Sequence, residues 1–150
     1  MIQRIFWILL LTTSLCFSQE KEQEVKNTID TFFHGLHTGD TVLIKQVIHP
    51  EITMQTTFFN NEGFPVLRTS SSDRFLKSIG SKKPEDIWFE KLLDYKIHID
   101  DNLASVWTPY EFYLNENFSH CGVNSFQLVK LNDGWVITYL IDTRRREACK

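Results

Sequence analysis

Between residues 93 and 143, apolar and polar side chains alternate with a period of two. This period places successive side chains on opposite faces of a β-strand. The pattern predicts strands at residues 93–99, 104–112, 123–131 and 135–143, and Asn132-Asp133-Gly134 is typical of a hairpin turn. The C-terminal half is therefore predicted to form an antiparallel meander, with Pro109 marking a bulge or an edge within its second strand.

The N-terminal half has the pattern of helices. Apolar residues recur at spacings of three and four between residues 20 and 37, which predicts an amphipathic helix. Gly39 ends this helix and Asp40 caps a second one, at residues 41–49. A hairpin at residues 52–69 and a short helix at residues 74–79 follow. About three helices grouped before a meander indicate an α+β fold, in which a curved, antiparallel or mixed sheet wraps around the helices and leaves a cone-shaped space.

The first 18 residues resemble a secretory signal peptide. Arg4 precedes an apolar run of roughly 13 residues, which is shorter than the about 20 that span a bilayer. Cys16 and Ser18 supply small residues before a cleavage site. A buried first element and a lipoprotein signal acylated at Cys16 are the alternatives, although Leu15 is bulky for the latter. We expect a signal peptide at 1–18, one domain at 19–150, and a secreted or periplasmic protein.

The charge and the cysteine content of the chain limit the partners and cofactors that we expect. The net charge is −3, and loss of Arg4 makes it more negative, which argues against nucleic acid. Cys121 and Cys149 permit one disulfide, and the sequence leaves its formation open. No phosphate-binding loop or metal motif is present. His34 and His37 share a helix face without an evident third ligand, so we expect no metal, no cofactor and no membrane contact after signal cleavage.

Two stretches carry a family resemblance. They are ASVWTPYEF at residues 104–112 and GWVITYLIDTRR at residues 134–145. With the two helices joined at Gly39-Asp40, they resemble a nuclear-transport-factor-2-like domain of cystatin-like fold. More narrowly, HCGVNSFQLVKLNDGWVITYLIDTRR resembles the secreted bacterial branch labelled lumazine-binding. The resemblance covers residues 20–145 and implies a central pocket and a homodimer formed through the sheet. Relatives include ketosteroid isomerases, cyclases and dehydratases as well as non-catalytic binding domains, so it implies no single function.

Polar and aromatic residues of the meander are candidates for a site. As contacts to a small, partly apolar ligand in the cone we predict Trp107, Tyr110, His120, Asn124 and Tyr139. The alternative is an enzyme that transfers a proton on a cyclic substrate, with Glu111 or His120 as the base and a tyrosine hydroxyl or the Trp107 indole as hydrogen-bond donor. Glu111 points inward only if the Pro109 irregularity reverses the alternation.

Strand geometry separates two of the reactive residues. His120 and Cys121 are neighbours, so their side chains point to opposite faces and cannot form a nucleophile–base pair. His120 and Asn124 share a face if the strand is regular. Asp142 is predicted on the face opposite Trp135. An ion pair or turn near the strand end is the favoured role for it, and acid–base chemistry is the alternative.

Overall fold

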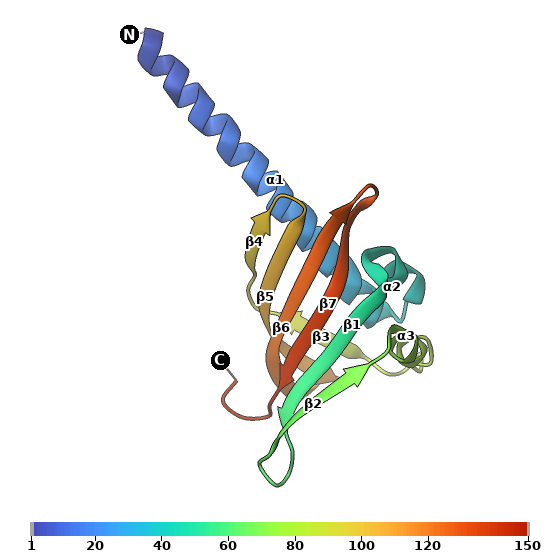
Figure 1. The fold of residues 1–150 in the computed structure, drawn as a ribbon. Coiled ribbons are helices and arrows are strands. Elements are labelled where there is room, and N and C mark those ends of the chain that lie inside the picture. The colour runs from blue at the N-terminus through green and yellow to red at the C-terminus, as the bar shows by residue number, and fades with distance from the viewer. Residues whose placement is uncertain (1, 150) are drawn as a thin grey trace.

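The computed structural model describes the backbone of residues 2–149 and the side chains of residues 19–149. The elements, in chain order, are α1 (Ile2–Thr38), α2 (Thr41–Val47), β1 (Ile48–Phe59), β2 (Pro65–Ser70), α3 (Ser72–Gly80), β3 (Trp88–Leu92), β4 (Lys96–Asp100), β5 (Leu103–Leu114), β6 (Asn117–Leu131) and β7 (Gly134–Arg144) (Figure 1). The side chains of the predicted signal peptide, residues 1–18, lie outside those described. No described helix is both long enough and apolar enough to cross a membrane.

One seven-stranded sheet forms the body of the protein. Its order is β2-β1-β7-β6-β5-β3, and β4 also pairs with β5. β1 and β7 run parallel, whereas the other pairs are antiparallel, so the sheet is mixed. The three helices precede the long C-terminal strands, and α1 crosses one face of the sheet (Figure 1). The predicted α+β architecture is confirmed.

The side of the sheet that faces α1 carries the core. Phe32 and Phe33 of α1 pack edge-on against Phe126 of β6. Val106 and Ile137 are fully buried on the same side. We call this side the inner face and the opposite side the outer face. The aromatic and branched side chains that the sequence placed at helix and strand spacings therefore act mainly as packing residues.

β5 changes its partner strand at Pro109. β4 pairs with residues 103–107 and β3 pairs with residues 110–114, so Pro109 lies at the point where one partner gives way to the other. A proline has no N–H to donate to a ladder, and this position is one where none is needed. The alternation continues through Thr108 and Tyr110 without reversal. The bulge or edge predicted at Pro109 is in fact a change of partner.

The face predicted for the end of β7 is wrong, because β7 has a β-bulge at Thr138. Ile137 pairs with Leu128 and Tyr139 pairs with Gln127, which leaves Thr138 as the extra residue. An extra residue shifts every later side chain to the other face. As a result Asp142 lies on the inner face with Trp135, not opposite it, and Tyr139 lies on the outer face.

A second bulge lies near the start of β6. Phe118 pairs with Tyr113 and His120 pairs with Phe112, so Ser119 is the extra residue. From His120 to Asn124 the pairing with β5 is regular, and the two side chains share the inner face as predicted.

Candidate ligand-binding and acid–base site

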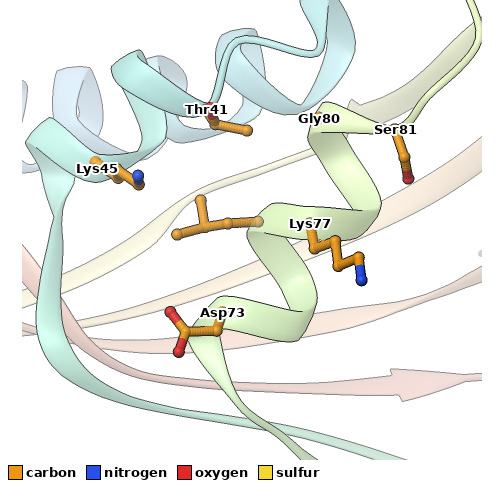
Figure 2. Close-up of a pocket in the computed structure, with 7 residues that line it drawn as sticks. Thr41, Lys45, Asp73, Lys77, Gly80 and Ser81 are labelled. Carbon is orange, nitrogen blue, oxygen red and sulfur yellow. The ribbon is translucent and has the colours of Figure 1, made fainter.

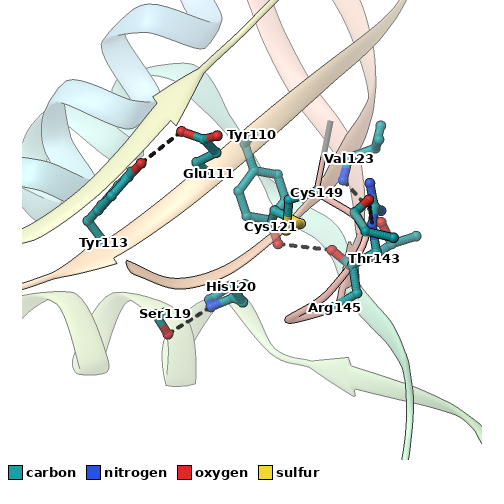
Figure 3. The surroundings of a disulfide bond; sticks show 11 residues. Tyr110, Glu111, Tyr113, Ser119, His120, Cys121, Val123, Thr143, Arg145 and Cys149 are labelled. Carbon is teal, nitrogen blue, oxygen red and sulfur yellow. Dashed lines mark hydrogen bonds between the residues drawn. A yellow bond between two sulfur atoms is a disulfide. The ribbon is translucent and has the colours of Figure 1, made fainter. Parts of the chain in front are cut away.

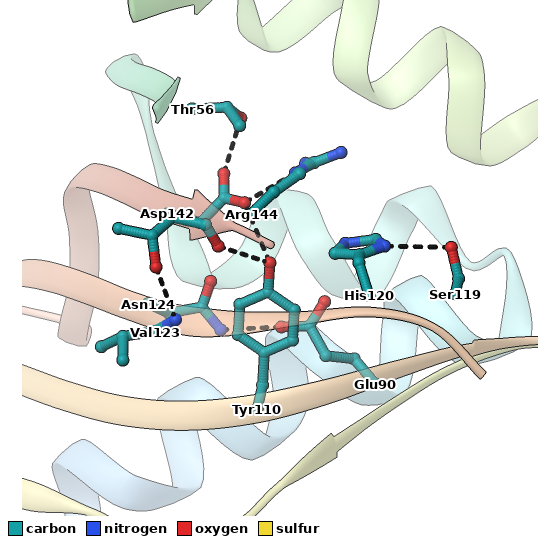
Figure 4. A network of polar contacts seen from close by, with 10 residues as sticks. Thr56, Glu90, Tyr110, Ser119, His120, Val123, Asn124, Asp142 and Arg144 are labelled. Atoms are coloured by element: carbon teal, nitrogen blue, oxygen red, sulfur yellow. Dashed lines mark hydrogen bonds and ion pairs between the residues drawn. The ribbon is translucent and has the colours of Figure 1, made fainter. Parts of the chain in front are cut away.

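The inner face becomes polar beyond Phe126, near the C-terminal ends of β5 and β7. Seven side chains from β1, β3, β5, β6 and β7 gather there, and we call them the inner cluster: Thr56, Glu90, Tyr110, His120, Asn124, Asp142 and Arg144 (Figure 4). Cross-strand pairing brings them together. Asn124 of β6 is registered with Asp142 of β7, and Tyr110 of β5 is registered with Gly122 of β6.

Glu90 is the carboxylate of the inner cluster whose pKa is raised by its surroundings. Asn124 Nδ2 donates a hydrogen bond to Glu90 Oε1 at 2.7 Å. Burial raises the pKa of Glu90 to about 7, and the nearby Asp142 carboxylate acts in the same direction, against the Asn124 hydrogen bond. The Glu90 backbone N–H donates to His37 Nε2 at 2.9 Å, which fixes β3 to the end of α1. Glu90 can therefore exchange a proton near neutral pH.

Asp142 is the best-satisfied carboxylate of the inner cluster. Thr56 Oγ1 donates to it at 2.6 Å and Arg144 Nε donates at 2.7 Å. The Tyr110 hydroxyl lies 3.1 Å from Asp142 Oδ2. A buried charge needs such partners, and with them Asp142 orients its neighbours.

Tyr110 of β5 extends over Gly122 of β6 and reaches β7 on the inner face. Its hydroxyl lies 2.9 Å from the Thr143 carbonyl oxygen, and the Val123 N–H donates to Thr143 Oγ1 instead of to that carbonyl. Gly122 makes this arrangement possible, because a Cβ there would stand 1.8 Å from the Thr143 oxygen and 2.8 Å from the Tyr110 ring. Burial, together with Asp142 and Glu90, raises the pKa of the Tyr110 phenol. Tyr110 therefore stays a neutral hydrogen-bond donor.

His120 lies at the edge of the inner cluster against two aromatic rings. Its ring centroid is 5.0 Å from that of Phe112 and 5.8 Å from that of Tyr110. Its Nδ1 lies 3.1 Å from Ser119 Oγ. Burial lowers the pKa of His120 to about 4, and the positive charge of Arg144 adds to the effect. The imidazole is therefore neutral near pH 7.

A disulfide fixes the end of the chain behind the inner cluster. Cys121 and Cys149 are bonded, with Cα atoms 5.9 Å apart (Figure 3). Cys121 and Arg145 also exchange two backbone hydrogen bonds of 2.9 Å. The bond that the sequence left open is formed in the structure, and it holds both thiols out of any nucleophilic role. It anchors the strand end that carries Arg144.

Three of the predicted site residues lie on the outer face. The Glu111 carboxylate accepts from the Tyr113 hydroxyl at 2.8 Å and lies 3.6 Å from Lys91 Nζ. The Tyr139 hydroxyl donates to Gln55 Oε1 at 2.6 Å, and Trp107 is 49% exposed. The structure thus brings together Tyr110, His120 and Asn124 and separates them from Trp107, Tyr139 and Glu111.

Sequence reasoning missed Glu90, Thr56 and Arg144, and for Asp142 it favoured a structural role over an acid–base one. A signal for Glu90 does exist, because Trp88, Glu90 and Leu92 alternate with exposed residues, so a carboxylate shares a face with two apolar side chains. The Thr138 bulge, which turns Asp142 and Arg144 inward, leaves no such signal.

A separate depression lies between α2 and α3. Its volume is about 480 Å³, and Lys45, Asp73 and Lys77 are among the residues that line it (Figure 2). It shares no residue with the inner cluster. Among the described residues, no group of three or more His, Cys, Asp or Glu side chains could hold a metal ion.

Comparison with known proteins identifies the fold. No family model matches the sequence, and no curated protein matches it. Solved structures do match. A nuclear transport factor 2-like superfamily protein from Salmonella enterica is 19% identical, covers 87% of this chain and 95% of its own, and has a TM-score of 0.62. A protein of unknown function from Mycobacterium tuberculosis is 10% identical, with 89% and 77% covered and a TM-score of 0.69.

A third neighbour carries the name of an activity. It is a protein from Shewanella frigidimarina provisionally described as a ketosteroid isomerase, 14% identical, with 79% of this chain and 94% of its own covered and a TM-score of 0.58. At these identities the likeness shows the fold alone. The chain has the nuclear-transport-factor-2-like, cystatin-like α+β fold, and this fold is compatible with ligand binding.

Proposed function

We propose that the protein binds a small, partly apolar molecule at the inner cluster. One observation carries the proposal: Glu90 is a partly buried carboxylate whose pKa is raised to about 7, and the side chain that donates a hydrogen bond to it is the neutral amide of Asn124. Burial of such a group costs stability, so a site that keeps one is a candidate for function. The aromatic rings of Tyr110 and Phe112 beside His120 supply an apolar wall for a ring.

The same geometry supports proton transfer as a second candidate function. A general base works best when its pKa lies near the working pH, which is the case for Glu90. Glu90 takes the place of Glu111, which faces the other side of the sheet. The one proton of the Tyr110 hydroxyl is directed at the Thr143 carbonyl and Asp142, so within the described residues the terminal nitrogens of Arg144 are the donors that would stabilise negative charge on a cyclic substrate.

A test of binding uses the protein purified from its natural host. We expect native mass spectrometry to detect a retained small molecule, and we expect Asn124→Ala to reduce its retention because Glu90 loses its partner. Gln127→Ala, on the outer face, is the matched control and should retain the molecule. No retained molecule, together with no amide shift at residues 120–124 in a screen of ring compounds, would rule out the binding proposal.

Two further expectations remain proposals. The outer face exposes Trp107 and Leu103, and we propose that it forms a homodimer. We also propose that the protein is secreted or periplasmic, since the Cys121–Cys149 bond is of the kind that persists in an oxidising compartment. The lumazine-binding branch stays a prediction of the sequence.

A further inference from the structure

Arg144 stands at the outermost position of the inner cluster. It follows Asp142 by two residues on β7 and therefore shares its face, next to Phe58 of the parallel strand β1. Its side chain is 52% exposed, whereas that of Asp142 is 10% exposed. The guanidinium thus lies where the buried part of the inner cluster meets solvent (Figure 4).

Only one edge of this guanidinium is occupied. Within the described residues, its hydrogen bond is the one from Nε to Asp142 Oδ2, at 2.7 Å. A guanidinium has five N–H donors in a fixed plane, so the two terminal nitrogens keep donors for another group. Asp142 is also held by Thr56 and Tyr110. The carboxylate therefore fixes the direction of the guanidinium and leaves its terminal nitrogens free for a ligand.

His120 provides a second hydrogen-bond donor close to Arg144. Its Nδ1 lies beside Ser119 Oγ, and within the described residues no hydrogen bond involves its Nε2. Arg144 and Arg146 both act on the ring as positive charges. Asp142 acts on the ring in the opposite direction, but it is the ion-pair partner of Arg144. The terminal nitrogens of Arg144 and the Arg146 guanidinium are therefore the groups that favour a negatively charged ligand at this end of the inner cluster.

We propose that the inner cluster takes a small organic anion, a carboxylate attached to a ring, with the terminal nitrogens of Arg144 as its anchor and Nε2 of His120 as a second donor. Planar guanidinium matches the geometry of a carboxylate, which a lysine would not. The rings of Phe112 and Tyr110 beside His120 give the ligand's ring a surface to pack on. This inference rests on the proposed binding function and narrows its ligand class.

Benzoate and benzamide test the inference, because they share a ring and differ in charge. We expect the disulfide-bonded protein to bind benzoate about tenfold or more tightly than benzamide in calorimetry or NMR titration. Arg144→Gln should weaken benzoate binding much more than benzamide binding and so remove this preference. Arg145→Gln is the matched control, because its Nε donates to the Ala148 carbonyl of the chain end, and it should keep the preference.

The position of benzoate is read from the His120 ring signals. A bound anion favours the imidazolium form, so saturating benzoate should raise the pKa of His120. Equal binding of benzoate and benzamide, or a preference that survives Arg144→Gln, would overturn the anion inference and leave the binding proposal standing. Benzoate binding without a change at His120 would also overturn it. Binding of neither compound at millimolar concentration would count against the ring-binding site itself.

Discussion

Glu90 and Glu111 lie on the neighbouring strands β3 and β5 but on opposite faces of the sheet. Lys91, next to Glu90 in sequence, is registered with Glu111. Glu111 meets the Lys91 ammonium and the Tyr113 hydroxyl on the outer face. Glu90 meets the Asn124 amide, with Asp142 nearby, on the inner face. The same residue type becomes an ion-pair partner on one face and a proton-exchanging group on the other, because the surroundings set the chemistry.

The largest expected effect on stability comes from filling the space between Gly122, the Thr143 backbone and the Tyr110 ring. Gly122→Ala places a methyl group against the Thr143 backbone, so either the β6–β7 ladder or Tyr110 must move. We expect a loss of about 3 kcal/mol or more in the free energy of unfolding, measured by urea denaturation. Gly80→Ala is the control, because its added Cβ meets Thr41 at 3.4 Å and should be tolerated. A Gly122→Ala protein as stable as the parent would show that the inner cluster does not depend on the absence of a side chain at Gly122.

The disulfide comes next in size. Cys149→Ser releases a link across 28 residues, and bonds closing loops of this size contribute about 3 kcal/mol. Hydrogen exchange at the Cys121 and Arg145 amides should speed up more than exchange in β4, because the bond anchors that strand end. Reduction of the parent protein with dithiothreitol should reproduce the variant. Uniform acceleration across the sheet would contradict a local anchoring role.

The sequence predicted the face of β5 correctly and the faces of residues in β7 and β3 incorrectly or not at all. The alternation of residues 104–112 sets the inner face of β5 correctly, because apolar periodicity is a local property. The face of Asp142 was predicted wrongly, because the Thr138 bulge depends on packing between strands. Glu90 was missed although it alternates with the apolar Trp88 and Leu92, because a pattern limited to the five residues of β3 is short. Burial is a property of the assembled fold.

A smaller effect is expected in the pH dependence of the free energy of unfolding, where Glu90 and Glu111 are compared. The pKa of Glu90 is near 4.5 when unfolded and about 7 when folded, so between these values the folded state holds the proton more tightly. The stabilisation from protonated Glu90 is therefore complete below about pH 4.5, and the free energy of unfolding falls by about 3 kcal/mol as the pH rises through 7. Glu90→Gln should remove this loss and make the protein more stable at pH 8. Glu111→Gln, on the outer face, is the control and should still show the loss that Glu90 causes.

The smallest effect on stability is expected at Trp107. Because its side chain is half exposed on the outer face, Trp107→Ser should change the free energy of unfolding by only about 0.5 kcal/mol. The same change should weaken self-association about tenfold or more if the outer face forms a homodimer, as measured by analytical ultracentrifugation. A parent protein that stays monomeric at high concentration would remove the dimer proposal and leave the inner cluster unaffected.

A pH titration of the Glu90 carboxyl carbon tests the difference between the two faces most directly. In protein labelled with ¹³C at the glutamate side-chain carboxyls, Glu90→Gln assigns the signal and Asn124→Ala reports on its hydrogen bond. We predict a titration midpoint near 7 for Glu90, and a higher midpoint in Asn124→Ala because that hydrogen bond favours the ionised form. A midpoint below about 5, in the ordinary range of a glutamate, would contradict the proton-exchanging role of Glu90.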